Sequence, residues 1–245
     1  MHALIVFAHP EPRSFNGAMK DTALDSLARL GWSSEVSDLY AERFNPAAGP
    51  GDVCAVPSAE RAFSLMQAQR EAATKGGYVE EIAREQQRLT NADLVIFQFP
   101  VWWYSVPAVL KGWFDRVLTH GFAYDDEHTF DQGLLRGKRA MVSLTTGGSA
   151  DELAADAHRT GMPRDWLRVV EGGTLGFVGM QVLPPFIAFA PGSLHEVSLA
   201  AELARWRDHL ISVLAAVRFA NKADSGSPQR IAQPVSHSAH HGDVL

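Results

Sequence analysis

Short apolar segments that alternate with longer segments of helical periodicity place the strongest constraint on how this chain folds. The first, residues 3–8 (ALIVFA), has no polar position, as in a strand buried on both faces of a parallel sheet. Ser14 is the expected N-cap of the helix that follows. We expect strands over residues 3–8, 34–39, 93–99, 139–145 and 177–183, and helices over residues 14–30, 58–73, 79–89, 108–118 and 194–219.

The order of these elements predicts an α/β domain of the flavodoxin-like class. This is a doubly wound five-stranded parallel sheet with helices on both faces and right-handed crossovers. We place the domain at residues 1–221, with residues 45–57 as a long loop. Residues 222–245 are polar and contain Ser, Gly, Pro and His, so we interpret them as a C-terminal extension outside the core.

The composition is that of a soluble globular protein, with 46% hydrophobic and 20% charged residues. A formal net charge of -6 argues against a general nucleic-acid or membrane-surface binder, because both need a basic face. The apolar N-terminal run is too short to span a bilayer and lacks the features of a signal peptide, so we expect no stable membrane insertion. The single cysteine, Cys54, suits the cytoplasm, and no basic residue flanks it to indicate a redox role.

Ligands of such a sheet bind outside the carboxyl ends of the strands, so the segments after the strands form the candidate site. The first, residues 9–16, resembles a phosphate-binding turn: Ser14 offers a hydroxyl, Asn16 an amide, and the helix its free N–H groups. His9 and Arg13 are candidates for added positive charge. The alternative is that Ser14 only caps the helix while His9 shapes the turn. No glycine-rich dinucleotide or Walker motif follows a strand.

Three aromatic residues, Trp102, Trp103 and Tyr104, follow the third strand in a segment that Pro100 and Pro107 mark as a loop. The fourth strand is followed by TTGGS, where glycine lets the backbone approach a ligand closely. A ligand that uses all three segments has a phosphate end and a planar heteroaromatic end, which fits a flavin nucleotide. The alternative for the aromatic residues is that they fill a core or a subunit interface.

Several longer stretches resemble the NAD(P)H:quinone oxidoreductase family of flavoproteins, which includes DT-diaphorase and modulator-of-drug-activity-type reductases. The stretches are ALIVFAHPEPRSFNGAMK, SDLYAERFNP, ADLVIFQFPVWWYSVPAVLKGWFDRV, GFAY, SLTTGGS and GTLGFVGMQVLPP, within residues 1–185. The resemblance implies a homodimer with FAD at an active site on the subunit interface. It also implies ping-pong two-electron hydride transfer from NADH or NADPH, via flavin N5, to a quinone or a similar small aromatic acceptor.

The same resemblance implies roles for individual residues. The matching positions are His9, Ser14, Phe15 and Asn16 at the pyrophosphate and adenosine side; Pro100, Val101, Trp102, Trp103 and Tyr104 beside the isoalloxazine ring; and Thr145, Thr146, Gly147 and Gly148 at the polar edge of the ring. Backbone N–H groups of Gly147 and Gly148 would stabilise charge on the reduced ring, and His158 is the hypothetical proton donor. Leu153 stands where well-studied relatives have a tyrosine, which puts the substrate range in doubt.

We predict no metal site. An acidic cluster follows GFAY, but its spacing matches no ligand pattern and a solvated loop is favoured; its members are Asp125, Asp126, Glu127, His128 and Asp131. Adventitious metal binding is the interpretation of the tail histidines, His237, His240 and His241.

Two alternative functions remain from the sequence. One is an FMN-dependent azo- or nitroreductase of the same fold, which the identity of the bound flavin would distinguish. The other is a cytoplasmic ancillary subunit of a glutathione-gated potassium efflux system, which the greater length of this chain disfavours. The sequence does not distinguish NADH from NADPH, and it does not name the physiological acceptor.

Overall fold

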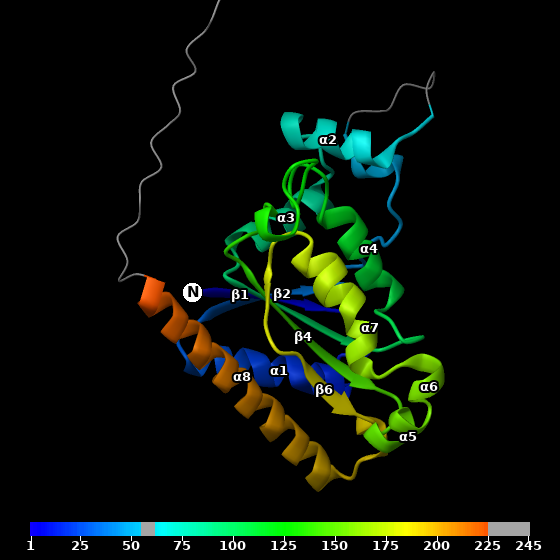
Figure 1. Ribbon diagram of the computed structural model, residues 1–245, viewed down its shortest axis with the longest axis vertical. Helices are drawn as coiled ribbons and strands as arrows, with labels where there is room; N and C mark the ends of the chain where they lie inside the picture. The colour runs from blue at the N-terminus through cyan, green and yellow to red at the C-terminus, as the bar shows by residue number, and fades with distance from the viewer. Residues whose placement is uncertain (55–61, 225–245) are drawn as a thin grey trace, which may run out of the picture.

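The computed structural model describes residues 1–54 and 62–224 and confirms the flavodoxin-like fold class (Figure 1). Its parallel sheet has the order β2-β1-β3-β4-β5, and a further strand, β6, also pairs with β4. The strands are β1 (His2–Phe7), β2 (Ser33–Asp38), β3 (Leu94–Pro100), β4 (Arg139–Thr146), β5 (Gln181–Val182) and β6 (Phe186–Phe189). The strand order reverses between β1 and β3, which is the switch point where ligands of such sheets bind.

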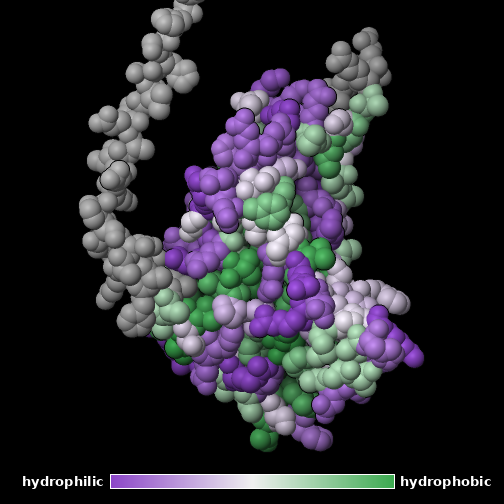
Figure 2. All heavy atoms as spheres, in the orientation of Figure 1, coloured by the Kyte–Doolittle hydropathy of each residue, from purple (hydrophilic) through white to green (hydrophobic). Residues whose placement is uncertain are grey.

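Helices cover both faces of this sheet. The helices are α1 (Phe15–Arg29), α2 (Leu65–Lys75), α3 (Glu80–Asn91), α4 (Ala108–Val117), α5 (Ala150–Ala155), α6 (Ala157–Thr160), α7 (Pro163–Val170) and α8 (Glu196–Asp224). In Figure 1, α1 and α8 lie together on one side, while α3, α4 and α7 lie on the other. Hydrophilic side chains gather over α2 and α3 at the upper end of the molecule (Figure 2).

The core confirms that β1 is buried on both faces. Leu4 and Val6 pack into the cluster that α3, α4 and α7 cover, whereas Ala3 and Ile5 pack into the cluster beneath α1 and α8. Trp206 of α8 is fully buried, and its Nε1–H donates to the Met19 carbonyl of α1 at 2.9 Å. The hydrogen bond fixes α8 on α1 while the tryptophan ring fills the space between the helix pair and the sheet.

Two predicted helix ends differ from the structure. The helix predicted over residues 58–73 begins only at Leu65, after Ser64, whose side chain accepts from the Gln67 N–H; residues 58–61 lie outside the described part. The final helix continues to Asp224, past the predicted start of the tail at 222, and residues 225–245 are not described. None of the described helices is long and apolar enough to cross a bilayer.

The fifth strand was predicted over residues 177–183, and most of that segment is not a strand. A π-helical segment, Glu171–Gly176, leads into a turn that brings Val178 and Gly179 against Gly133. Leu135 N–H donates to the Val178 carbonyl at 3.0 Å, so this apolar backbone is satisfied without a sheet partner. Of the predicted strand, only the short β5 remains, and it pairs with the start of β4. The next strand, β6, pairs with the end of β4. Two prolines between β5 and β6 interrupt the ladder.

Candidate functional site

The turn between β1 and α1 leaves unpaired N–H groups at the start of a helix. Ser14 caps α1, and its hydroxyl accepts from the Gly17 N–H at 3.2 Å. In the described chain no acceptor lies within hydrogen-bonding distance of the Phe15 or Asn16 N–H. The close approach of this turn to α1 requires glycine at position 17. Any other residue would place its Cβ 1.9 Å from the Pro12 carbonyl oxygen. These N–H groups and the positive end of the helix dipole form a place for an anion.

The charge in this turn differs from the sequence-based expectation. Arg13 is exposed and pairs with Glu11 at 3.1 Å, and its hydrogen bonds hold the pKa of Glu11 at about 2. Burial lowers the pKa of His9 below its ordinary value of 6.5, so the ring is neutral at pH 7. Its Nδ1 lies 3.0 Å from both the amide nitrogen and the carbonyl oxygen of Glu11. Burial therefore favours a neutral ring in this turn over the positive charge that the sequence suggested.

A buried polar network joins the first turn to the two central strands. Asn16 Nδ2 donates to Thr145 Oγ1 at 2.9 Å, and Asn16 Oδ1 accepts from Gln98 Nε2 at 2.8 Å. All three residues are buried. Sequence analysis missed Gln98, although a polar residue within the apolar run DLVIFQF was a visible signal. The network fixes the relative positions of the loops that follow β1, β3 and β4.

The aromatic loop is a tight hairpin that presents its rings to solvent. Trp102 and Ser105 exchange both backbone hydrogen bonds at 3.0 Å, and the two residues between them, Trp103 and Tyr104, have φ of 53° and 59°. Such turns usually contain Asn and Gly, because a side chain with positive φ is strained. Trp102, Trp103 and Tyr104 are 41%, 95% and 47% exposed. The predicted loop is confirmed, and the described residues give these rings little cover.

Trp166 supports the aromatic loop from helix α7. Its ring meets Tyr104 edge-on, with centroids 4.9 Å apart and an interplanar angle of 73°. The indole N–H of Trp166 donates to the Thr160 carbonyl, which holds the ring in place. Sequence analysis did not find Trp166, because nothing in the sequence spacing places α7 beside a loop 60 residues earlier.

The loop after β4 offers a second pair of free N–H groups. Thr146 Oγ1 donates to the Gly148 carbonyl at 2.8 Å, and Ser149 begins α5 in a capping box with Glu152. Neither the Gly147 nor the Gly148 N–H donates to another described residue. A Cβ at Gly147 would meet nothing within 4 Å, so the backbone there is open to a ligand.

The two positions named for proton transfer lie beyond this loop. Leu153 stands over Gly148, where a Cβ on the glycine would be 3.2 Å from Leu153 Cδ2. His158 is exposed on α6, with Nδ1 3.3 Å from the Ala155 carbonyl oxygen and Nε2 accepting from Arg159 Nε at 3.1 Å. The structure thus engages both ring nitrogens locally, and the role of His158 stays a prediction.

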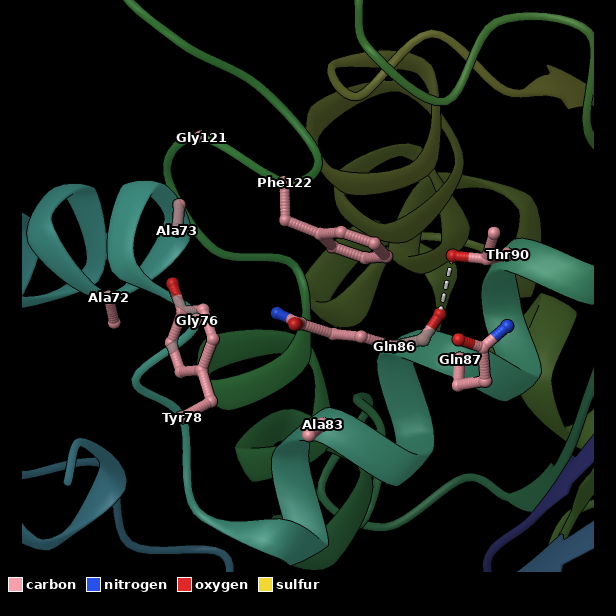
Figure 3. A pocket seen from close by; sticks show the side chains of 10 residues that line it. All are labelled: Ala72, Ala73, Gly76, Tyr78, Ala83, Gln86, Gln87, Thr90, Gly121 and Phe122. Atoms are coloured by element: carbon pink, nitrogen blue, oxygen red, sulfur yellow. Dashed lines mark hydrogen bonds between the residues drawn. The ribbon is translucent and has the colours of Figure 1, made fainter.

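A hollow and an acidic cluster in the described chain lie outside these loops. Residues of α2, α3 and the segment at Gly121 and Phe122 line a hollow of about 300 Å³. Figure 3 shows its side chains. Its polar groups are already bonded: Tyr78 donates to Thr119 Oγ1 at 2.8 Å, and Gln86 donates to the same oxygen at 3.0 Å. In the acidic cluster, Asp125 is turned inward onto His128 at 2.7 Å. Among described residues, no group of His, Cys, Asp and Glu is arranged to hold a metal ion.

The unpaired N–H groups and the exposed rings follow strands β1, β3 and β4, whose carboxyl ends meet at one edge of the parallel sheet. Free N–H groups at a helix N-terminus suit an anion, and exposed aromatic rings suit a planar group. The fold is that of a flavodoxin-like protein, and these groups make the carboxyl edge of its sheet the candidate ligand site.

Comparison with known proteins identifies the family. Residues 1–210 match a family of flavodoxin-like fold. The chain is 45% identical over 210 residues to ribosyldihydronicotinamide dehydrogenase (quinone) of Pongo abelii, across 86% of this chain and 90% of that protein. It is 39% identical over 211 residues to NAD(P)H dehydrogenase (quinone) 1 of Rattus norvegicus, across 86% of this chain and 77% of that protein.

A solved structure agrees with these sequence relatives. A putative quinone reductase from Klebsiella pneumoniae is 35% identical with a TM-score of 0.80, over 86% of this chain and 84% of that one. The chain belongs to the NAD(P)H:quinone oxidoreductase family and is an oxidoreductase, as its motifs predicted.

Proposed function

We propose that this protein is an FAD-dependent oxidoreductase that transfers hydride from a dihydronicotinamide to a quinone. One observation carries the proposal. Three loops at the carboxyl edge of the sheet carry two pairs of unpaired N–H groups, at Phe15–Asn16 and at Gly147–Gly148, and a set of exposed aromatic rings. The names of the relatives, which are quinone dehydrogenases, support the same conclusion.

In this proposal the chain supplies position and charge. The hydroxyl of Ser14 and the N–H groups of Phe15 and Asn16 would hold the pyrophosphate, with the neutral His9 ring beside it. Pro100, Val101 and the rings of Trp102, Trp103 and Tyr104 would flank the isoalloxazine ring, with Thr145 and Thr146 at its edge. The flavin that these residues would hold would supply the hydride-carrying chemistry between the nicotinamide and the quinone, in two separate half-reactions.

The Gly147 and Gly148 N–H groups would stabilise the negative charge that develops at the edge of the ring. They are preorganised, because the capping box of Ser149 and Glu152 fixes the backbone that follows them. Donors held in place before the reaction stabilise such charge without reorganisation. The rest of the oxidoreductase chemistry belongs to the cofactor.

We also propose that the protein acts as a homodimer in the cytoplasm. Trp102, Trp103 and Tyr104 are three consecutive exposed aromatic residues, and an exposed apolar patch is typical of a contact surface. A second copy, or a bound ring, would remove it from water. Sedimentation of the protein with and without FAD, beside a Trp103→Arg variant, tests this. A monomer in every case would contradict the dimer.

The purified protein tests the proposed function directly. We expect a yellow protein that releases FAD on acid treatment and whose visible absorbance is bleached anaerobically by NADH, NADPH or dihydronicotinamide riboside. Menadione should restore the colour. Release of FMN would favour the azo- or nitroreductase alternative. A colourless protein that binds neither flavin would remove the function, and association with a membrane antiporter would then favour the ancillary subunit.

A further inference from the structure

Reduction of a quinone to a hydroquinone takes up one hydride and one proton, and a hydride carrier does not supply the proton. The residue at the tyrosine position of the family, Leu153, is apolar. His158 has both ring nitrogens engaged, at 3.3 Å to the Ala155 carbonyl oxygen and at 3.1 Å to Arg159 Nε. Leu153 has no proton to donate and both ring nitrogens of His158 are engaged, so another side chain near the aromatic loop is a candidate donor.

The other hydroxyls of these loops are poorer proton donors than a phenol. The Thr146 hydroxyl donates to the Gly148 carbonyl. The Ser14 and Thr145 hydroxyls accept from Gly17 and Asn16 and keep their own protons, but an aliphatic hydroxyl is a much weaker acid than a tyrosine. By contrast, the Tyr104 hydroxyl has no hydrogen-bond partner anywhere in the described chain. Tyr104 as a residue is 47% exposed, so water can reach its side chain and return a proton.

Tyr104 is held in an unfavourable conformation that displays it. Its φ of 59° is in the left-handed region, where a residue with an aromatic side chain is strained. The edge of Trp166 supports its ring at a centroid distance of 4.9 Å. Strain of this kind persists where the surrounding structure enforces it, and it collects at functional sites. Here the enforced geometry places a phenol between the aromatic loop and α7.

We propose that the Tyr104 hydroxyl binds the carbonyl oxygen of the quinone and donates the proton that completes its reduction. This inference rests on the proposed function. The hydride supplies two electrons and one hydrogen nucleus; the O–H bond of Tyr104 breaks as a new O–H bond forms on the quinone oxygen, and the tyrosinate is reprotonated from water. The same hydroxyl would favour electron acceptors that carry an oxygen able to accept a hydrogen bond at the reacting end.

The Tyr104→Phe variant tests the proposal, because it removes the hydroxyl and keeps the ring against Trp166. We expect reduction of menadione by the reduced enzyme to slow at least about 10-fold and to lose its solvent isotope effect, as for loss of a general acid. Ferricyanide takes electrons without a proton, so its reduction should be unchanged. Without any reductant, menadione should bind the oxidised enzyme about 2- to 12-fold more weakly, as loss of one hydrogen bond predicts.

Two matched variants complete the experiment. Tyr78→Phe removes a hydroxyl that is bonded to Thr119 away from the crevice, so menadione reduction should stay at the wild-type rate. Ser105→Ala removes the neighbouring hydroxyl of the loop. The proposal is wrong if Tyr104→Phe leaves menadione reduction unchanged, or if it slows the reduction of menadione and of ferricyanide equally. It is also wrong if Ser105→Ala slows menadione reduction as Tyr104→Phe is expected to do. Failure of the wild-type protein to be reduced by any dihydronicotinamide would instead remove the proposed function, and this inference with it.

Discussion

Asn16 donates its side-chain amide to Thr145 Oγ1 at 2.9 Å, although 129 residues separate the two positions in the sequence. The Oδ1 atom of the same amide accepts from Gln98 at 2.8 Å. One buried side chain of α1 therefore connects this helix to β3 and β4, close to the ends of the strands where the loops begin. Gln98 Oε1 is already buried without a partner. Loss of one more hydrogen bond would leave further buried polar groups unsatisfied, so the network makes the geometry of these elements sensitive to a single residue.

Replacement of Asn16 by Ala should weaken both the fold and the site. Thr145 and Gln98 would be left buried without their partner, at a cost of about 1–3 kcal/mol in the free energy of unfolding. Because the loops lose their connection, we also expect the Kd for FAD to rise. Urea unfolding of the flavin-free protein and a flavin titration measure the two effects separately.

Ser26→Ala is the control for Asn16→Ala. Ser26 is also buried on α1, but its hydroxyl donates to the Thr22 carbonyl at 2.7 Å within the same helix. We expect a smaller loss of stability and an unchanged Kd for FAD. Equal Kd values for the two variants would show that the network does not position the loops.

The turn of the aromatic loop predicts a conflict between stability and function. In the double variant Trp103→Asn/Tyr104→Gly, two residues that tolerate positive φ would replace two strained ones. Relief of such strain is worth about 1–3 kcal/mol per residue, so thermal or urea unfolding should show a more stable protein. Flavin binding and quinone reduction should be lost together with the rings.

Gly137→Ala is the comparison variant, because it should lower the free energy of unfolding where the double variant should raise it. Gly137 has a φ of +87°, and a Cβ there would meet nothing within 4 Å, so only backbone strain changes. We expect destabilisation of about 1 kcal/mol without an effect on flavin binding. If the double variant at 103 and 104 is no more stable than the wild type, the aromatic turn does not store strain.

The sequence predicted the parts of this fold that local patterns determine. The apolar run of β1, the cap at Ser14 and the aromatic loop bounded by Pro100 and Pro107 all follow from spacing and residue type, and the structure confirms them. The segment predicted as the fifth strand, by contrast, is apolar because it is a buried turn and not because it is a strand. Val178 is buried because its turn packs against Gly133, and burial alone does not distinguish a strand from a buried turn.

The candidate site likewise contains residues that the sequence could predict and residues that it could not. Residues that follow strands were found, because parallel strands end at one edge of the sheet. Residues that reach the crevice from elsewhere were not, and Trp166 contacts Tyr104 only because α7 folds back over the loop. The paired state of Arg13 was equally invisible, since it depends on the backbone turn that brings Glu11 beside it.

His158→Ala distinguishes the residue suggested by family resemblance from the residue suggested by geometry. Because His158 is exposed and its ring is bonded to Ala155 and Arg159, we expect the variant to reduce menadione at the wild-type rate. Stopped-flow measurement of the quinone half-reaction, beside Tyr104→Phe, decides between them. A loss at His158 with no loss at Tyr104 would restore the role that the sequence assigned to the histidine.

Glu171 gives a prediction about pH. Its Oε1 atom is buried without a partner, and burial raises the pKa of this carboxyl above its ordinary 4.5, opposed in part by Arg164. The folded state therefore prefers the protonated form: its stability is full below pH 4.5 and falls as the pH rises through the raised pKa.

Glu171→Gln cannot ionise, so it should be more stable than the wild type at pH 7. Partial exposure of the side chain limits the gain to less than about 1 kcal/mol. The difference should shrink as the pH is lowered and vanish below pH 4.5, the ordinary value for an unfolded glutamate. Urea unfolding across this pH range measures it, with Glu127→Gln in an exposed loop as the control. A gain that is the same at every pH would show that shape rather than charge is responsible, because only the ionisation of Glu171 links its burial to pH.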